Sequence, residues 1–216
     1  APQERPNPFA ALPIVALCSA ALLLLAAAAA GRDLWFFSDD WNIFADYHSG
    51  NLLTPFNGHL SLVPAGIYQV LFHTVGMGSY LPYRLAGLIA LAVLAFQVIR
   101  ATQVRLGPAG RQGLPVGAIA VALATTAVLW NSSGKMNLLF PFLMNFTIPI
   151  AALLAIWWHL DRAADDTAQD GTTNHAGALR HEIGASVWLV VALATSGLGL
   201  MTLAAVGVEL LVSRAP

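Results

Sequence analysis

Long apolar runs constrain this chain more than any other feature, because a stretch of about 20 apolar residues fits a lipid bilayer better than water. Such runs cover residues 9–30, 82–98, 116–130, 138–158 and 183–212. Only 10% of the residues are charged, and 57% are hydrophobic. This is the composition of an integral membrane protein and not of a soluble domain. The sequence therefore predicts an all-α fold, a polytopic membrane helical bundle.

The last apolar run is too long for one upright helix. A continuous helix over 183–212 would reach about 45 Å, against a hydrocarbon core of about 30 Å. Ser196-Gly197-Leu198-Gly199 offers a break inside it. We therefore predict two short spans joined by a tight turn, which brings the expected number of transmembrane helices to about six. A single, strongly tilted helix is the alternative.

The stretch from Leu60 to Met77 is also apolar, and it could either span the membrane or lie along its surface. Cytoplasmic loops are rich in arginine and lysine. If this stretch is an interfacial helix and the N-terminus is cytoplasmic, seven arginines are cytoplasmic and only Arg32, Arg84 and Lys135 are outside. If it spans, the bias reverses. We therefore expect a multi-pass plasma-membrane protein with a first extracytoplasmic loop over 31–80 and a polar cytoplasmic loop over 161–182.

Two adjacent acids, Asp39 and Asp40, stand at the head of this loop in the run Trp35-Phe36-Phe37-Ser38-Asp39-Asp40-Trp41. Carboxylates are costly to keep among aromatic side chains at a membrane face. Such surroundings raise the pKa of a carboxyl group and make it a usable base. Neighbours on a helix point about 100° apart, so only one of the two is expected to face a reacting group. The alternative is an aromatic belt whose acids face water.

Three further side chains could bind a phosphate group. They are His59 in Asn57-Gly58-His59, Arg84 at the start of the second apolar run, and Lys135 in an external turn. An ordinary surface histidine, and basic side chains that snorkel to the interface, would explain them equally well. The net charge of -1 and the lack of a basic run argue against a nucleic-acid partner.

The order of these features resembles the GT-C superfamily of membrane glycosyltransferases, which use polyprenyl-phosphate-linked sugars as donors. In that family the first span leads into an external loop with an acidic pair, two interfacial helices follow, and a second span returns to the cytoplasm. Fuller members have more spans and often a C-terminal domain, so we expect residues 1–216 to be a single transmembrane domain from a larger protein. The matching runs are Ser38-Asp39-Asp40-Trp41, Asn57-Gly58-His59-Leu60-Ser61-Leu62-Val63-Pro64 followed by Leu71-Phe72-His73-Thr74-Val75-Gly76, Leu81-Pro82-Tyr83-Arg84-Leu85 and Thr195-Ser196-Gly197-Leu198-Gly199-Leu200.

The resemblance implies an inverting sugar transfer on the extracytoplasmic face. One acid, Asp39 in preference to Asp40, would deprotonate the hydroxyl of a glycan, lipid or protein acceptor. The donor phosphate would be bound by His59, Arg84 and Lys135, or by a divalent cation (Mg²⁺ or Mn²⁺) held by the two acids. Membrane lipid is a further implied partner. Two other classes of protein stay open: a transporter or lipid flippase that uses the acids for ion coupling, and a non-catalytic membrane scaffold of the same fold.

Overall fold

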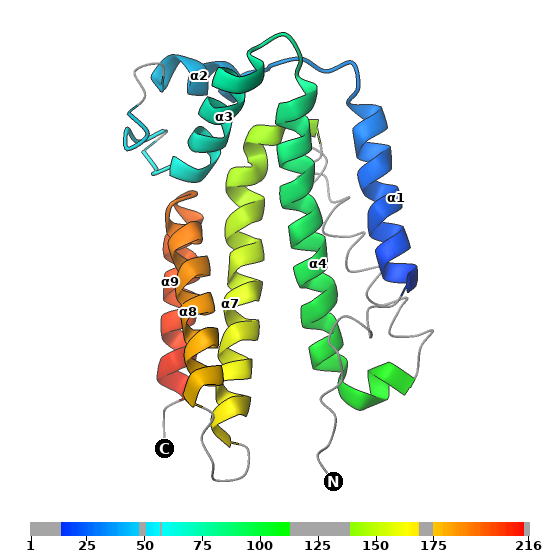
Figure 1. Ribbon diagram of the computed structural model, residues 1–216, viewed down its shortest axis with the longest axis vertical. Coiled ribbons are helices and arrows are strands. Elements are labelled where there is room, and N and C mark those ends of the chain that lie inside the picture. The colour runs from blue at the N-terminus through cyan, green and yellow to red at the C-terminus, as the bar shows by residue number, and fades with distance from the viewer. Residues whose placement is uncertain (1–13, 48–50, 57, 113–138, 169–174, 214–216) are drawn as a thin grey trace.

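The structure of the protein is a computed structural model that describes residues 14–47, 51–56, 58–112, 139–168 and 175–213. Two short helices, α2 (Asp39–Asp46) and α3 (Leu62–Val75), lie across one end of a set of longer helices (Figure 1). The described residues form helices joined by turns and irregular segments, with no strand and one isolated bridge between Phe56 and His59, which agrees with the predicted all-α fold. The longer helices are α1 (Ile14–Ala30), α4 (Leu81–Gln112), α7 (Met144–Ala168), α8 (His175–Leu193) and α9 (Leu198–Ser213), and a short 3-10 helix, η1 (Pro141–Leu143), leads into α7.

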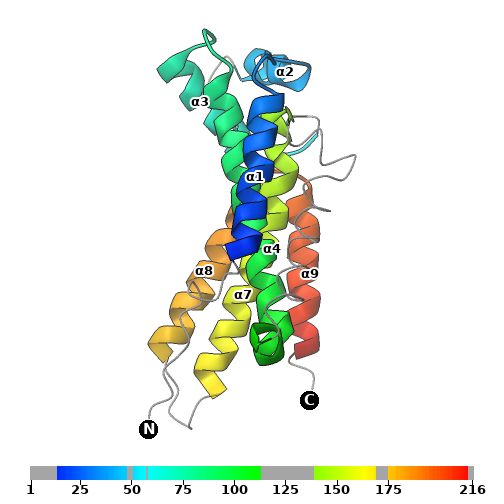
Figure 2. The ribbon, with the colours of Figure 1, turned by 90° about the vertical axis from the view of Figure 1, so that its right-hand side faces the viewer.

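The long helices run side by side along the axis of the molecule, and Figure 2 shows the same arrangement after a quarter turn. α7 lies at the centre, because it packs against α4, α8 and α9, while α1 packs against α4. We call α2 and α3 together the crossing layer.

Among the described residues, three helical segments are long and apolar enough to cross a membrane: Leu81–Ala101, Pro141–Asp166 and Ala176–Leu193. They correspond to the predicted second and fourth spans and to the first half of the last apolar run. The apolar helices Leu62–Val75 and Leu198–Val212 are shorter. The predicted third span, 116–130, lies outside the described residues, and the total of about six spans stays a prediction.

The predicted break in the last apolar run is confirmed. α8 ends at Leu193 and α9 begins at Leu198. The hydroxyl of Ser196 accepts a hydrogen bond from the backbone N–H of Leu198 (3.2 Å), which satisfies a free donor at the start of α9. Gly199 fits against the end of α8 because it has no side chain, and a Cβ at this position would overlap with the carbonyl oxygen of Ala192.

Much of the polar stretch 161–182, which we expected to be a loop, is helical. α7 continues to Ala168 and α8 begins at His175, so the helices take up most of it. Alanine has the highest helix propensity, and Ala163 and Ala164 follow Arg162 in this part of α7. Polarity alone therefore does not end a helix that already has a long apolar part.

An aromatic cluster fastens the crossing layer to the long helices. The ring of Phe36 lies edge-on to Tyr80 and Tyr83, with ring centroids 4.7 and 4.9 Å apart. Phe142 of η1 packs against Tyr68 of α3 in the same buried cluster. Edge-to-face aromatic pairs add about 0.5–1.5 kcal/mol each beyond the area that they bury. This cluster therefore sets the position of α2 relative to the start of α4.

We predict that Gly199→Ala lowers the free energy of unfolding by about 1–3 kcal/mol, because the new methyl group meets backbone that cannot move aside. Gly207→Ala is the matched control, since nothing lies within 4 Å of a Cβ at Gly207 in the same helix. That variant should be neutral or more stable by up to about 1 kcal/mol. Denaturation of both variants in detergent tests this, and equal effects would contradict the close approach at Gly199.

Candidate functional site

Asp40 is buried in the crossing layer and holds three elements together. Its side chain is 1% exposed. Its carboxylate accepts hydrogen bonds from the hydroxyl of Tyr68 in α3, from the hydroxyl of Tyr80 just before α4 (2.6 Å) and from the backbone N–H of Phe37 (3.0 Å). Hydrogen bonds to a charged acceptor are worth about 1.5–3 kcal/mol each. These contacts therefore bind α2 to α3 and to the start of α4.

Burial raises the pKa of Asp40 above its ordinary value of 3.8, even though its three hydrogen-bond donors oppose the shift. The neighbouring charge of Asp39 adds a smaller increase. Burial, together with the hydrogen bond to Asp40 and its charge, also raises the pKa of both Tyr68 and Tyr80. Both phenols therefore keep their protons and remain donors to the carboxylate.

Asp39 has a different environment, although it is the next residue in sequence. Its carboxylate is half-buried and accepts one long hydrogen bond from the side-chain amide of Asn42 (3.4 Å). Because neighbours on a helix point about 100° apart, fixing Asp40 inward turns Asp39 toward the surface. The large side chains exposed around this part of the chain are aromatic: Trp35, Phe37 and Trp41. A carboxylate beside such rings can meet a ligand that carries both hydroxyl groups and apolar faces.

The turn into α2 is strained at Ser38. Its φ of 46° with ψ of -108° lies in the region that favours glycine, and its side chain makes no capping hydrogen bond. Backbone outliers of this kind persist only where the surroundings impose them, and they are common at functional sites. Here the surroundings are the two hydrogen bonds between Phe37 and Asp40, one from each backbone N–H. The strain therefore lies directly before Asp39.

His59 lies where the crossing layer meets the turn between α8 and α9. Its backbone pairs with that of Phe56, and its ring is 2.7 Å from the place that a Cβ on Gly197 would occupy. Nearby, the N–H of Val63 donates to the carbonyl of Ala194 (3.0 Å). The predicted interfacial segment and the predicted break are thus in contact.

Arg84 is buried, and it caps the end of α1. Its guanidinium donates to the carbonyl oxygens of Ala27 (2.9 Å) and Ala28 (3.2 Å). These carbonyls lie in the last turn of α1, where backbone acceptors have no partner in the helix and the helix dipole is negative. Within the described residues, no hydrogen bond or ion pair joins Asp39 to Arg84 or to His59. Lys135, the third candidate for phosphate binding, lies outside the described residues.

The two acids do not fit a shared cation site. Both oxygens of Asp40 accept hydrogen bonds from tyrosine hydroxyls that stay protonated. In the described part of the chain, no group of three or more His, Cys, Asp or Glu side chains could hold a metal ion. Of these two acids, only Asp39 has a carboxylate oxygen that could still bind a divalent cation.

The sequence alone did not identify Tyr68 and Tyr80 as the hydrogen-bond donors to Asp40. They lie 28 and 40 residues further along the chain, and no spacing rule links residues so far apart. A tyrosine in a mostly apolar helix was the one available signal, since a buried phenol requires a partner for its hydroxyl.

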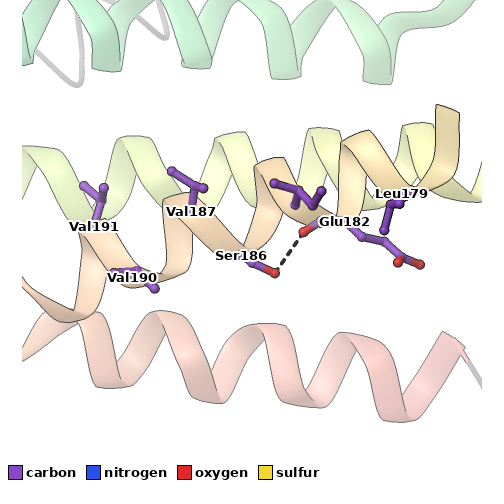
Figure 3. A pocket seen from close by; sticks show the side chains of 7 residues that line it. Leu179, Glu182, Ser186, Val187, Val190 and Val191 are labelled. Atoms are coloured by element: carbon purple, nitrogen blue, oxygen red, sulfur yellow. Dashed lines mark hydrogen bonds between the residues drawn. The ribbon is translucent and has the colours of Figure 1, made fainter. Parts of the chain in front are cut away.

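A shallow apolar groove of 490 Å³ lies elsewhere, on the outer surface of α8 (Figure 3). Its lining comes from α8 alone and includes Ile183, Val187 and Val190, with Glu182 and Ser186 beside them. None of the predicted site residues lines it. Only 17% of this candidate span is buried, which is the pattern of a helix that presents apolar side chains to lipid.

No family model matches this chain, and neither a curated protein nor a solved structure matches it. Over the residues that the structure describes, the fold is that of a helical protein with three helices that could span a membrane.

We predict that protonation of Asp40 stabilises the fold. The pKa of Asp40 is raised in the folded state, so the stability that it contributes is fully present below pH 3.8 and is lost as pH rises through the folded pKa. Asp40→Asn should therefore flatten the fall in the free energy of unfolding that begins as pH rises above 3.8. Unfolding in detergent at several pH values measures this. Asp46→Asn is the control, because Asp46 is an exposed acid at the other end of α2, and this variant should keep the pH dependence of the wild type. If Asp40→Asn also keeps the wild-type pH dependence, the prediction is wrong.

We also predict that Tyr80→Phe costs more stability than Tyr83→Phe. Tyr80 donates to a buried carboxylate, and its loss should cost about 1–3 kcal/mol. Tyr83 donates to the neutral carbonyl of Gly76 (3.1 Å), where about 0.5–1.5 kcal/mol is expected. Denaturant unfolding near neutral pH compares the two, and the opposite order would show that Asp40 is not the anchor of this layer.

Proposed function

We propose that this protein is a GT-C-like glycosyltransferase, or the N-terminal membrane part of one. It moves a sugar from a polyprenyl-phosphate donor to an acceptor hydroxyl on the extracytoplasmic face of the plasma membrane. In this proposal the N-terminus is cytoplasmic and the crossing layer faces outward. The main support is the difference between two neighbouring acids: Asp40 is enclosed by hydrogen-bond donors, while Asp39 is only half-buried, in a segment whose aromatic side chains are exposed.

Asp39 is the base of the proposed reaction. It removes the proton of the acceptor hydroxyl as the acceptor oxygen forms a bond to the anomeric carbon of the sugar. The bond from that carbon to the phosphate oxygen breaks, and the polyprenyl phosphate leaves with the electron pair. Attack on the face opposite to the leaving group inverts the anomeric configuration. Asp40 is then a positioning residue that turns Asp39 toward the acceptor.

The leaving phosphate requires positive partners, and the proposal assigns this task to His59 and Lys135. The guanidinium of Arg84 already donates to two carbonyls at the end of α1, so we assign it to holding α1 against α4. Exposed Trp35, Phe37 and Trp41 are suited to the sugar face and the lipid chain of the donor, because aromatic rings pack against both.

An ion-coupled transporter fits the geometry less well. Such proteins place their ionisable groups near the middle of the bilayer, in broken helices. Here Asp39 and Asp40 lie in α2, across the end of the long helices (Figure 1). A non-catalytic scaffold would explain why Asp40 is buried and hydrogen-bonded, but it would give the carboxylate of Asp39 no role. Replacement of Asp39 can therefore distinguish the scaffold from the enzyme.

We predict that Asp39→Asn lowers sugar transfer by about 10²–10⁴-fold, the usual contribution of a general base. The assay follows release of polyprenyl phosphate by the full-length protein in membranes that contain the cell's own polyprenyl-phosphate sugars. Asp46→Asn is the matched control, because it removes an exposed acid from the same short helix. The assignment of Asp39 as the base would be wrong if the Asp39→Asn variant releases polyprenyl phosphate as fast as the wild type. It would also be wrong if Asp46→Asn lowers the release as much as Asp39→Asn does.

A further inference from the structure

A cluster of basic and aromatic side chains lies toward the end of the long helices that is opposite to the crossing layer. It contains Arg100 of α4, Trp158, His159 and Arg162 of α7, and His181 of α8. Arg100 follows Arg84 by 16 residues on α4, or about 24 Å along the helix axis. Since the hydrocarbon core is about 30 Å thick, the cluster lies near the headgroups of the opposite leaflet when α4 crosses the bilayer.

The two arginines lie around one indole ring. Cζ of Arg100 is 4.1 Å from the centroid of the Trp158 ring, and Cζ of Arg162 is 5.7 Å from it. The ring attracts each guanidinium through its negative face. The two positive charges nevertheless repel each other, and the low dielectric constant near a membrane strengthens this repulsion.

Two hydrogen-bond donors of the cluster lack acceptors. Nη2 of Arg100 and Nε1 of Trp158 are buried and have no acceptor among the described residues. Nε2 of His181 lies 3.9 Å from a carboxylate oxygen of Asp166, and Nδ1 of His181 lies 3.1 Å from Nδ1 of His159. In the part of the chain that the structure describes, no ion pair links Arg100 or Arg162 to a carboxylate. Buried donors without acceptors are costly, and an anion would satisfy them.

We propose that this cluster binds a phosphate group, with Arg100 and Arg162 on either side of it and the indole N–H of Trp158 as a further donor. A guanidinium matches a phosphate with two parallel hydrogen bonds. Basic pockets between membrane helices bind phospholipid headgroups in the same way. A lipid headgroup and a soluble phosphate would supply the same chemistry, and the experiment below separates these two sources. The proposal is independent of the sugar-transfer reaction.

The first test compares ligands on the full-length protein in a maltoside detergent, with the melting temperature as readout. The probes are phosphatidylglycerol, a diacylglycerol with the same acyl chains, and inorganic phosphate. We expect phosphatidylglycerol to raise the melting temperature and diacylglycerol to leave it unchanged. A rise with phosphatidylglycerol but not with inorganic phosphate identifies a lipid source, and an equal rise with both identifies a soluble one. Equal effects of phosphatidylglycerol and diacylglycerol would overturn the proposal, because the arginines then merely snorkel.

The second test compares variants in a titration with the phosphate ligand that stabilises the wild type. Arg100→Gln and Arg162→Gln should weaken binding by about tenfold or more, because each removes a charge-assisted pair of hydrogen bonds. Trp158→Phe keeps an aromatic ring but removes the indole N–H, and it should weaken binding less. Arg180→Gln is the matched control, since Arg180 is an exposed arginine of α8, and its effect should stay within about twofold.

A last comparison separates binding from folding. In detergent without phosphate, Arg162→Gln should not lower the melting temperature, because it relieves the repulsion between two guanidinium groups around one ring. The same variant should lose the increase that phosphate causes. If Arg162→Gln destabilises the phosphate-free protein, or if Arg180→Gln weakens binding as much as Arg100→Gln, the proposed site is wrong.

Discussion

The hydrogen bonds between the carboxylate of Asp40 and the hydroxyls of Tyr68 and Tyr80 are the interaction on which the crossing layer depends. A carboxyl group that is removed from water needs donors, and here each donor comes from a different part of the chain. The helix that carries Asp40 therefore has one position in which its buried acid is satisfied. The short α2, with only 8 residues, would be marginal by itself. It is held in place by this acid and by the aromatic rings packed around it.

The orientation of Asp39 follows from the anchoring of Asp40. Two neighbours on a helix cannot face the same way, so an inward Asp40 leaves Asp39 at the surface beside exposed rings. The strained Ser38 directly before it indicates that the turn is imposed by these contacts and is not a preference of the local sequence. One acid thus stabilises the layer, and the other is left with a carboxylate that a ligand can reach.

Local features of this fold could be predicted from the sequence, while contacts between distant residues could not. Apolar runs predicted the helices, and a Ser-Gly-Leu-Gly run predicted the break before α9, because both signals lie within a few residues. The partners of Asp40 escaped prediction because they are 28 and 40 residues away. Arg84 was expected at a phosphate, but it donates to the end of α1, more than 50 residues earlier. The sequence did not predict the helical content of 161–182, because its polar residues suggested a loop while its alanines favour a helix.

The contact between Val63 and Ala194 gives the α8–α9 hairpin a mechanical connection to the acids. The backbone of α3 is bonded to the turn of this hairpin at one end, and its Tyr68 is bonded to Asp40 further along the same helix. A helix is stiff over this length, so α3 holds the turn of the hairpin and the carboxylate of Asp40 at a fixed separation. The turn between α8 and α9 is therefore joined through one helix to the hydroxyl that holds Asp40, the residue next to Asp39.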